Sequence, residues 1–170
     1  PTRTGRKGYV LGVEHKTTLV YDDPKRVDLT LGGRYSGNLD RLPAYQNVEI
    51  KVTKLASLEA RLNYTNVTGS MGRVDDEKGR KASLVAGADR VDGKTVFGMY
   101  GTFDAGIPLG TRHSSVWLRS AAGFSPNDVN NRFANFYFGG FGNNWVDHRT
   151  EKRYREFYGF PGLELNEAGG

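Results

Sequence analysis

The sequence predicts an all-β fold built from long antiparallel strands. First, apolar and polar residues alternate over segments of about 9 to 11 residues. Second, residues that favour turns separate these segments. Third, no long stretch repeats its apolar residues with the period of about 3.6 that a helix requires. Together these observations leave strands as the main element of the chain.

The clearest alternation lies between Arg26 and Leu39. One set of alternate positions holds Val27, Leu29, Leu31, Tyr35 and Leu39, and the other holds Arg26, Asp28, Thr30, Arg34, Ser36 and Asn38. Because successive side chains of a strand point to opposite faces, this segment is predicted to have one apolar and one ionic face. In the same way, Tyr9, Leu11, Val13, Leu19 and Tyr21 are expected to face away from Glu14, Lys16 and Thr18.

About eight strands are predicted in order along the chain. The first four are Gly8–Tyr21, Arg26–Gly37, Tyr45–Lys54 and Leu58–Val67, and each is an alternating segment bounded by polar or turn residues. The next three, Lys81–Arg90, Thr95–Asp104 and His113–Phe124, contain glycines that permit bends in a barrel wall. The last, Phe133–Gly140, is aromatic and ends in paired glycines.

Short and long connections are predicted to alternate. The short turns are Asp22–Lys25, Leu55–Ser57 and Val91–Lys94, of which the last contains the Asp-Gly step typical of tight hairpins. The longer connections are Asn38–Ala44, Thr68–Arg80 and Ala105–Arg112, and only Ser125–Arg132 departs from the alternation. An up-and-down barrel in an outer membrane has short turns on one side and long loops on the other.

Strands with one apolar and one ionic face need a different environment on each side. A transmembrane β-barrel offers lipid outside and water or polar side chains inside, so this antiparallel up-and-down barrel is the predicted architecture. The mean hydropathy of −0.58 is compatible with it, because half of each strand faces the lumen. A soluble sandwich or lipocalin-like barrel is the alternative that shares the alternation of strands and turns.

Composition narrows the class of function. The 170 residues are predicted to form a single domain, 1–170, that is a fragment of a longer barrel protein. The net charge is +5, but the Lys and Arg residues are interleaved with Asp and Glu and form no basic stripe with stacking aromatics. This distribution argues against nucleic-acid binding. Cysteine is absent, and His15, His113 and His148 lack metal-ligand spacing. No catalytic set, cofactor or metal site is predicted.

The last third of the chain contains the most specific motif. The sequence Phe136-Tyr137-Phe138-Gly139-Gly140 follows a Gly-Ile-Pro-Leu-Gly-Thr-Arg-His-Ser-Ser stretch and an Arg-Ser-Ala-Ala-Gly strand, and a loop rich in arginine and aromatics comes after it. From Ile107 to Gly170 this arrangement resembles the C-terminal barrel of the bacterial surface-antigen superfamily. That superfamily includes barrel-assembly insertases and two-partner secretion transporters.

The resemblance implies a long loop that folds back into the lumen, where an arginine near its tip contacts the inner wall. By position, Gly139 and Gly140 match the glycines at the strand end. The matches in the loop are Arg153 and Arg155, ahead of Phe160, Pro161 and Gly162, although the family's compact Leu-Arg-Gly-aromatic motif is missing. Fork-shaped guanidinium groups suit carboxylates such as Glu14, Asp28, Glu49 or Glu59.

The resemblance further implies a role in the insertion or translocation of proteins at the bacterial outer membrane, without enzymatic activity. The expected partners are the lipid bilayer, client outer-membrane or secreted proteins, and periplasmic domains of the same chain. A passive channel or uptake barrel is the second expectation, and a soluble all-β binding module is the third.

Overall fold

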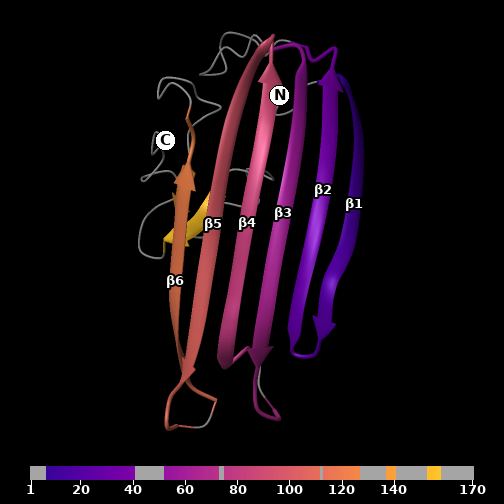
Figure 1. Cartoon of the computed structure of the whole chain (residues 1–170). Coiled ribbons are helices and arrows are strands. Elements are labelled where there is room, and N and C mark those ends of the chain that lie inside the picture. The colour runs from indigo at the N-terminus through magenta and orange to yellow at the C-terminus, as the bar shows by residue number, and fades with distance from the viewer. Residues whose placement is uncertain are drawn as a thin grey trace.

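A computed structural model describes residues 7–40, 52–72, 75–111 and 113–126, together with the backbone of two short strands at 137–140 and 153–157. Six strands form one antiparallel sheet in which each strand pairs with its neighbour in sequence (Figure 1). They are β1 (Tyr9–Asp22), β2 (Lys25–Gly37), β3 (Leu55–Thr68), β4 (Lys78–Val91), β5 (Lys94–Pro108) and β6 (Ser115–Phe124). The predicted all-β class and the up-and-down order are confirmed within these ranges.

Two predictions about the third and fourth strands are wrong. Residues Leu55–Ser57 were expected to form a turn, but they are the first residues of β3 and pair with β4 along their full length. The register also joins β2 directly to β3, with Ser36 opposite Leu55. Val52–Lys54 therefore belong to the connection between these strands and not to a strand over Tyr45–Lys54, of which residues 45–51 lie outside the described ranges. The alternating pattern at 48–53 resembles a strand locally, but the longer apolar register of 55–68 forms the pair with β2.

This change of pairing alters the arrangement of the turns. The two-residue turns Asp23–Pro24 and Asp92–Gly93 lie at opposite ends of the sheet, because an odd number of strands separates them (Figure 1). The expected grouping of short turns at one end and long connections at the other is therefore absent among the described strands. Asp92 and Gly93 both have positive φ angles, 46° and 89°. That geometry is the one tight hairpins favour, as the Asp-Gly step predicts.

The faces of the strands follow from the register, since residues opposite each other on paired strands share a face. One row contains Thr17, Leu29, Leu62, Leu84, Gly101 and Ala122. The adjacent row on the other face contains Thr18, Asp28, Asn63, Ser83 and Thr102. The predicted division into two faces is therefore present across the sheet, with one error in β1. A bulge between Thr18 and Val20 shifts the register, so that Tyr21 lies opposite Arg26 on the polar face.

The last two strands lie apart from the predicted scheme. Strand β7 (Tyr137–Gly140) pairs in parallel with β8 (Arg153–Phe157), and these two form a separate two-stranded sheet. Phe133–Gly140 was expected to continue the antiparallel wall, and its described part does not. No helix in the described ranges is both long enough and apolar enough to cross a bilayer.

Candidate functional site

The two faces of the six-stranded sheet differ in composition. We define the apolar face by its large side chains, which are Tyr9, Leu11, Val13, Val20, Val27, Leu29, Leu31, Tyr35, Leu58, Leu62, Tyr64, Leu84, Phe97, Met99, Phe103, Ile107, Val116, Leu118 and Phe124. The polar face is the other one. It contains nearly all of the charged side chains in the middle of the strands, among them Glu14, Lys16, Asp28, Arg34, Glu59, Arg61, Asp89, Asp104 and Arg119.

The face with most of the large apolar side chains is the more exposed one, which is the reverse of the arrangement around an apolar core in water. Most of the large side chains of the apolar face are exposed, with Val13 at 76%, Leu58 at 67% and Leu118 at 65%. The buried apolar side chains among the described residues, Val85, Val91 and Val96, lie on the polar face. Soluble monomers rarely expose a continuous apolar patch of more than a few hundred Å². The apolar face therefore needs an apolar environment or a covering partner.

An arginine lies at each end of the apolar face on β4. Arg80 and Arg90 lie on this face, and the positions between them on the same face are Ala82, Leu84, Ala86 and Ala88. At about 3.3 Å per residue, the strand from Arg80 to Arg90 is about 33 Å long. An apolar segment of this length lies in the range that a tilted membrane strand uses.

The apolar region runs obliquely across the strands. On β1 it begins at Tyr9, which lies two residues beyond the row that contains Tyr35 and Arg90. On β5 and β6 it extends in the other direction, to Ile107 and Val116, past the row that contains Arg80. A band of constant height crosses a sheet in this way when the strands are tilted relative to it.

The polar face has an ionic cluster centred on Asp28. Thr18 donates a hydrogen bond to Asp28 from its hydroxyl (2.7 Å), and Arg26 Nε lies 2.8 Å from the second carboxylate oxygen. Lys16 Nζ is 4.0 Å away. The Asp28 side chain is only 12% exposed, and these contacts offset the cost of burying its charge. Glu59 and Arg61 form a second ion pair on this face, at 2.8 Å.

Two connections are joined at the end of the sheet where β3 and β5 finish. Glu77, in the connection before β4, accepts hydrogen bonds from the backbone N–H of Ser70 (2.8 Å) and from its hydroxyl (3.1 Å). His113 Nδ1, in the connection before β6, lies 2.8 Å from the same carboxylate. The Ser70 backbone N–H, followed by the His113 hydrogen bond, lowers the pKa of Glu77 from its ordinary value. We call Ser70, Glu77 and His113 the loop clamp.

Trp117 reinforces the same end of the sheet on the polar face. Its indole Nε1 donates to the backbone carbonyl of Asp76 (3.1 Å), and Lys81 Nζ lies 5.7 Å from the ring centroid. Lys81 also forms an ion pair of 2.7 Å with Asp76. The ring covers Gly106, where an added Cβ would lie 2.5 Å from it. A residue with no side chain is therefore needed opposite this tryptophan.

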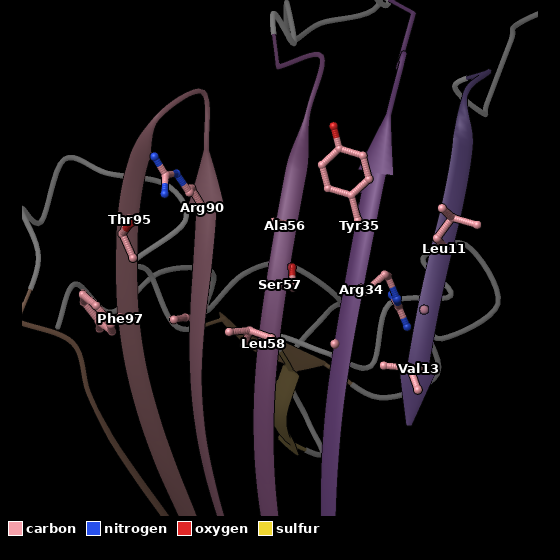
Figure 2. A pocket seen from close by; sticks show the side chains of 13 residues that line it. Leu11, Val13, Arg34, Tyr35, Ala56, Ser57, Leu58, Arg90, Thr95 and Phe97 are labelled. Carbon is pink, nitrogen blue, oxygen red and sulfur yellow. The ribbon is translucent and has the colours of Figure 1, made fainter. Parts of the chain in front are cut away.

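The apolar face contains a hollow at the end opposite the loop clamp. Its volume is about 730 Å³, and its sides are formed by Leu11 and Val13 of β1, Tyr35 of β2, Leu58 of β3 and Phe97 of β5 (Figure 2). Small residues at Gly33, Ala56 and Ala88 form its floor, because their side chains leave the space between the larger ones open. Arg90 and Thr95 lie at the rim.

The residues singled out from the sequence fall into three groups. Glu14, Asp28 and Glu59 lie together on the polar face, whereas Glu49 is outside the described ranges. The backbones of Gly139 and Gly140 pair with those of Glu156 and Phe157, and that of Arg153 pairs with Tyr137. This pairing brings the glycine motif beside the strand that contains Arg153 and Arg155. Phe160, Pro161 and Gly162 are outside the described ranges.

Sequence reasoning missed the loop clamp and the hollow. Residues 75–77 are three consecutive acidic residues in the connection before β4, where Asp76 forms an ion pair with Lys81 and Glu77 contacts His113. No pattern of spacing could have shown a contact between residues 77 and 113. Within the described ranges no group of three metal-ligating side chains comes together. The chain matches no protein-family model, no curated protein and no solved structure.

Proposed function

We propose that the six-stranded sheet is part of the wall of a membrane-spanning β-barrel in the bacterial outer membrane, with the apolar face in the lipid and the polar face toward the lumen. The observation that carries this proposal is the reversed burial of the two faces. Apolar side chains are exposed across the six strands, whereas the buried side chains of Val85, Val91 and Val96 lie on the polar face. Lipid would remove the cost of that exposure, since transmembrane barrels have apolar side chains outside and polar ones inside.

The dimensions of the apolar face support the same proposal. At a tilt of about 40°, the stretch of about 33 Å between Arg80 and Arg90 has a height of about 25 Å, which is the height of the lipid-facing band of outer-membrane barrels. The oblique course of the band across the strands agrees with such a tilt. Aromatic residues lie toward its two ends, where lipid headgroups would be. The rings of Tyr9 and Tyr35, for example, are 6.0 Å apart at one end.

The activity that we propose for this barrel is assistance to the insertion or translocation of proteins. Its support is the resemblance of residues 107–170 to the surface-antigen superfamily, in particular the strand ending at Gly139 and Gly140. The pairing of this strand with the segment that contains Arg153 adds a backbone link between the two parts of the motif. The mechanism would depend on the shape of the wall and its loop and would need no bond chemistry.

A passive channel is the second candidate, and the mixed charge of the polar face favours it. Asp28 with Arg26 and Glu59 with Arg61 would place both signs of charge on a water-filled lumen. Such a lining suits the passage of small polar solutes without strong selection by charge.

The membrane proposal is tested by spin labels on neighbouring residues of β3. The chain has no cysteine, so Leu62→Cys and Asn63→Cys each introduce a single labelling site. In reconstituted vesicles, the label at position 62 should be accessible to oxygen, which concentrates in lipid, and the label at 63 to a water-soluble nickel complex. Met71→Cys, in a connection, is the control for full water access. Equal nickel access at positions 62 and 63 would overturn the proposal.

The two activities are separated in the same vesicles. An insertion role predicts that vesicles containing the chain speed the folding of an added unfolded outer-membrane barrel, compared with empty vesicles. A passive channel predicts stable ion conductance and no such acceleration. Folding at the rate seen with empty vesicles would therefore reject the insertion role.

A further inference from the structure

The hollow on the apolar face lies beside Arg90, which has no counter-ion among the described residues. Arg90 is exposed at the rim, and it forms no ion pair within the described part of the chain. Its neighbours across the strands are Ala56 on β3 and Thr95 on β5, which carry no charge. An arginine that lacks a partner beside an apolar surface is suited to a ligand with an anionic group and an apolar tail.

The lining of the hollow fits the apolar part of such a ligand. Leu11, Val13, Leu58 and Phe97 contribute aliphatic and aromatic surface, and the floor at Gly33, Ala56 and Ala88 lets a chain lie close to the sheet. Leu58 Cδ2 would be 3.3 Å from a Cβ at Gly33, so a side chain at this position would crowd Leu58 and narrow the hollow. The volume of about 730 Å³ is within the range of about 300 to 1,000 Å³ that ligand sites have.

The polar part of the ligand is set by the residues at the rim. Guanidinium binds phosphate through two parallel hydrogen bonds, and the hydroxyl group of Thr95, which lies opposite Arg90 on β5, can add a further donor. Arg90 and Thr95 lie in a single row of the apolar face, together with Leu11, Tyr35 and Ala56. A phosphate bound there would lie at the end of the apolar band, at the level that a lipid headgroup occupies.

We propose that this hollow is a binding site for one anionic phospholipid, with an acyl chain along the floor and the phosphate bound by Arg90. This inference rests on the proposed membrane location. It goes further in assigning a specific lipid site to one end of the wall. Charge complementarity at Arg90 selects an anionic lipid over a zwitterionic one, and the small residues select this place over the rest of the apolar face.

Arg80 offers a matched control. It lies on β4 and on the apolar face like Arg90, it is exposed, and it has no ion pair within the described ranges. It is at the other end of the band and does not line the hollow. A general attraction of cations to anionic lipid would therefore affect both arginines equally, whereas a built site would depend on Arg90 alone.

The test uses the full chain in phosphatidylcholine vesicles that contain a spin-labelled phosphatidylglycerol or a spin-labelled phosphatidylcholine. The immobilised fraction of each lipid gives the relative affinity of the protein for it. We expect the parent chain to prefer phosphatidylglycerol. In Arg90→Gln this preference should fall about tenfold, because one strong charge-assisted contact is lost. In Arg80→Gln it should stay near the parent value. Equal loss in both variants, or no preference in the parent chain, would overturn the site.

A second variant tests the hollow separately from the charge. Ala88→Leu fills the floor beside Arg90 and should release the immobilised lipid while Arg90 is retained. Glycerol phosphate, which has the anionic group without the tail, should compete only weakly, and full competition by it would show that the apolar hollow takes no part. The labels at positions 62 and 63 are read in parallel vesicles that contain unlabelled lipid, so that failure to enter the bilayer is distinguished from failure to bind the lipid.

Discussion

Leu84 and Val85 are neighbours in β4, yet 53% of the leucine surface is exposed and only 3% of the valine surface. Val85 lies on the polar face between Arg61 and Tyr100, and Leu84 lies on the apolar face between Leu62 and Gly101. In a protein that folds around an apolar core in water, the face with more apolar side chains would be the buried one. This sheet has the opposite arrangement, and the environment of Leu84 is therefore the central question.

We predict that Leu84→Lys destabilises the chain by about 2 to 4 kcal/mol in lipid vesicles, because position 84 lies near the middle of the apolar band. Denaturant unfolding of the reconstituted protein measures this difference. Leu109→Lys is the control, since Leu109 has a similar exposure of 49% but lies in the connection between β5 and β6. Its effect should stay within about 0.5 kcal/mol. An equally small effect at position 84 would mean that water surrounds it.

Much of the sheet could be predicted from the sequence because period-two alternation is a local property. The apolar and ionic faces of residues 27–35 and 58–64 lie as the pattern indicates. Tyr21 was misplaced because the bulge after Thr18 moves it to the other face, and no residue in this segment signals a bulge. Leu55–Ser57 were mistaken for a turn because strand ends depend on the partner strand. Pairing with Ser36 and Val91 extends β3 beyond its most regular part.

The candidate site was less predictable, because it depends on contacts between distant residues. The division into a polar and an apolar face followed from charge alternation alone. The loop clamp and the Trp117 contacts join residues about 40 positions apart, whose proximity depends on the strand register. The hollow depends on the alignment of small residues from three strands, and each of Gly33, Ala56 and Ala88 is unremarkable in its own segment.

Asp28 provides a test of the polar face. We predict that Asp28→Ala destabilises the chain by about 1 to 3 kcal/mol, because Arg26 and Thr18 lose their acceptor where the face is buried. Asp28→Asn should cost less, since its carbonyl oxygen still accepts a hydrogen bond. Glu14→Ala, on the same face but exposed, should be nearly neutral. Unfolding in vesicles gives the three values, and equal effects of Asp28→Ala and Glu14→Ala would contradict the role of the cluster.

Two glycines on β5 provide a matched pair for the Trp117 contact. Both Gly98 and Gly106 lie on the polar face, but an added Cβ meets the indole ring only at Gly106 and meets nothing within 4 Å at Gly98. Gly106→Ala should therefore displace Trp117 and weaken its hydrogen bond to Asp76, with a loss of about 1 to 3 kcal/mol. Near-ultraviolet circular dichroism and unfolding report the two effects. Gly98→Ala should change neither, and an unaltered Trp117 signal in Gly106→Ala would show that the ring can move aside without loss.

The loop clamp predicts a dependence of stability on pH. Because the pKa of Glu77 is lowered in the folded chain, its carboxylate stabilises the fold above its ordinary pKa of 4.5, and this contribution disappears as the pH falls through the lower folded value. Glu77→Gln removes the charge at every pH. The difference in unfolding free energy between parent and variant should therefore be larger at pH 6 than at pH 3, with Glu14→Gln as the control for a carboxylate outside the clamp. The Ser70 amide proton should shift in the same pH range in the parent only, because that N–H donates to Glu77. A difference between parent and Glu77→Gln that is the same at both pH values would show that the charge of Glu77 does not hold the two connections together.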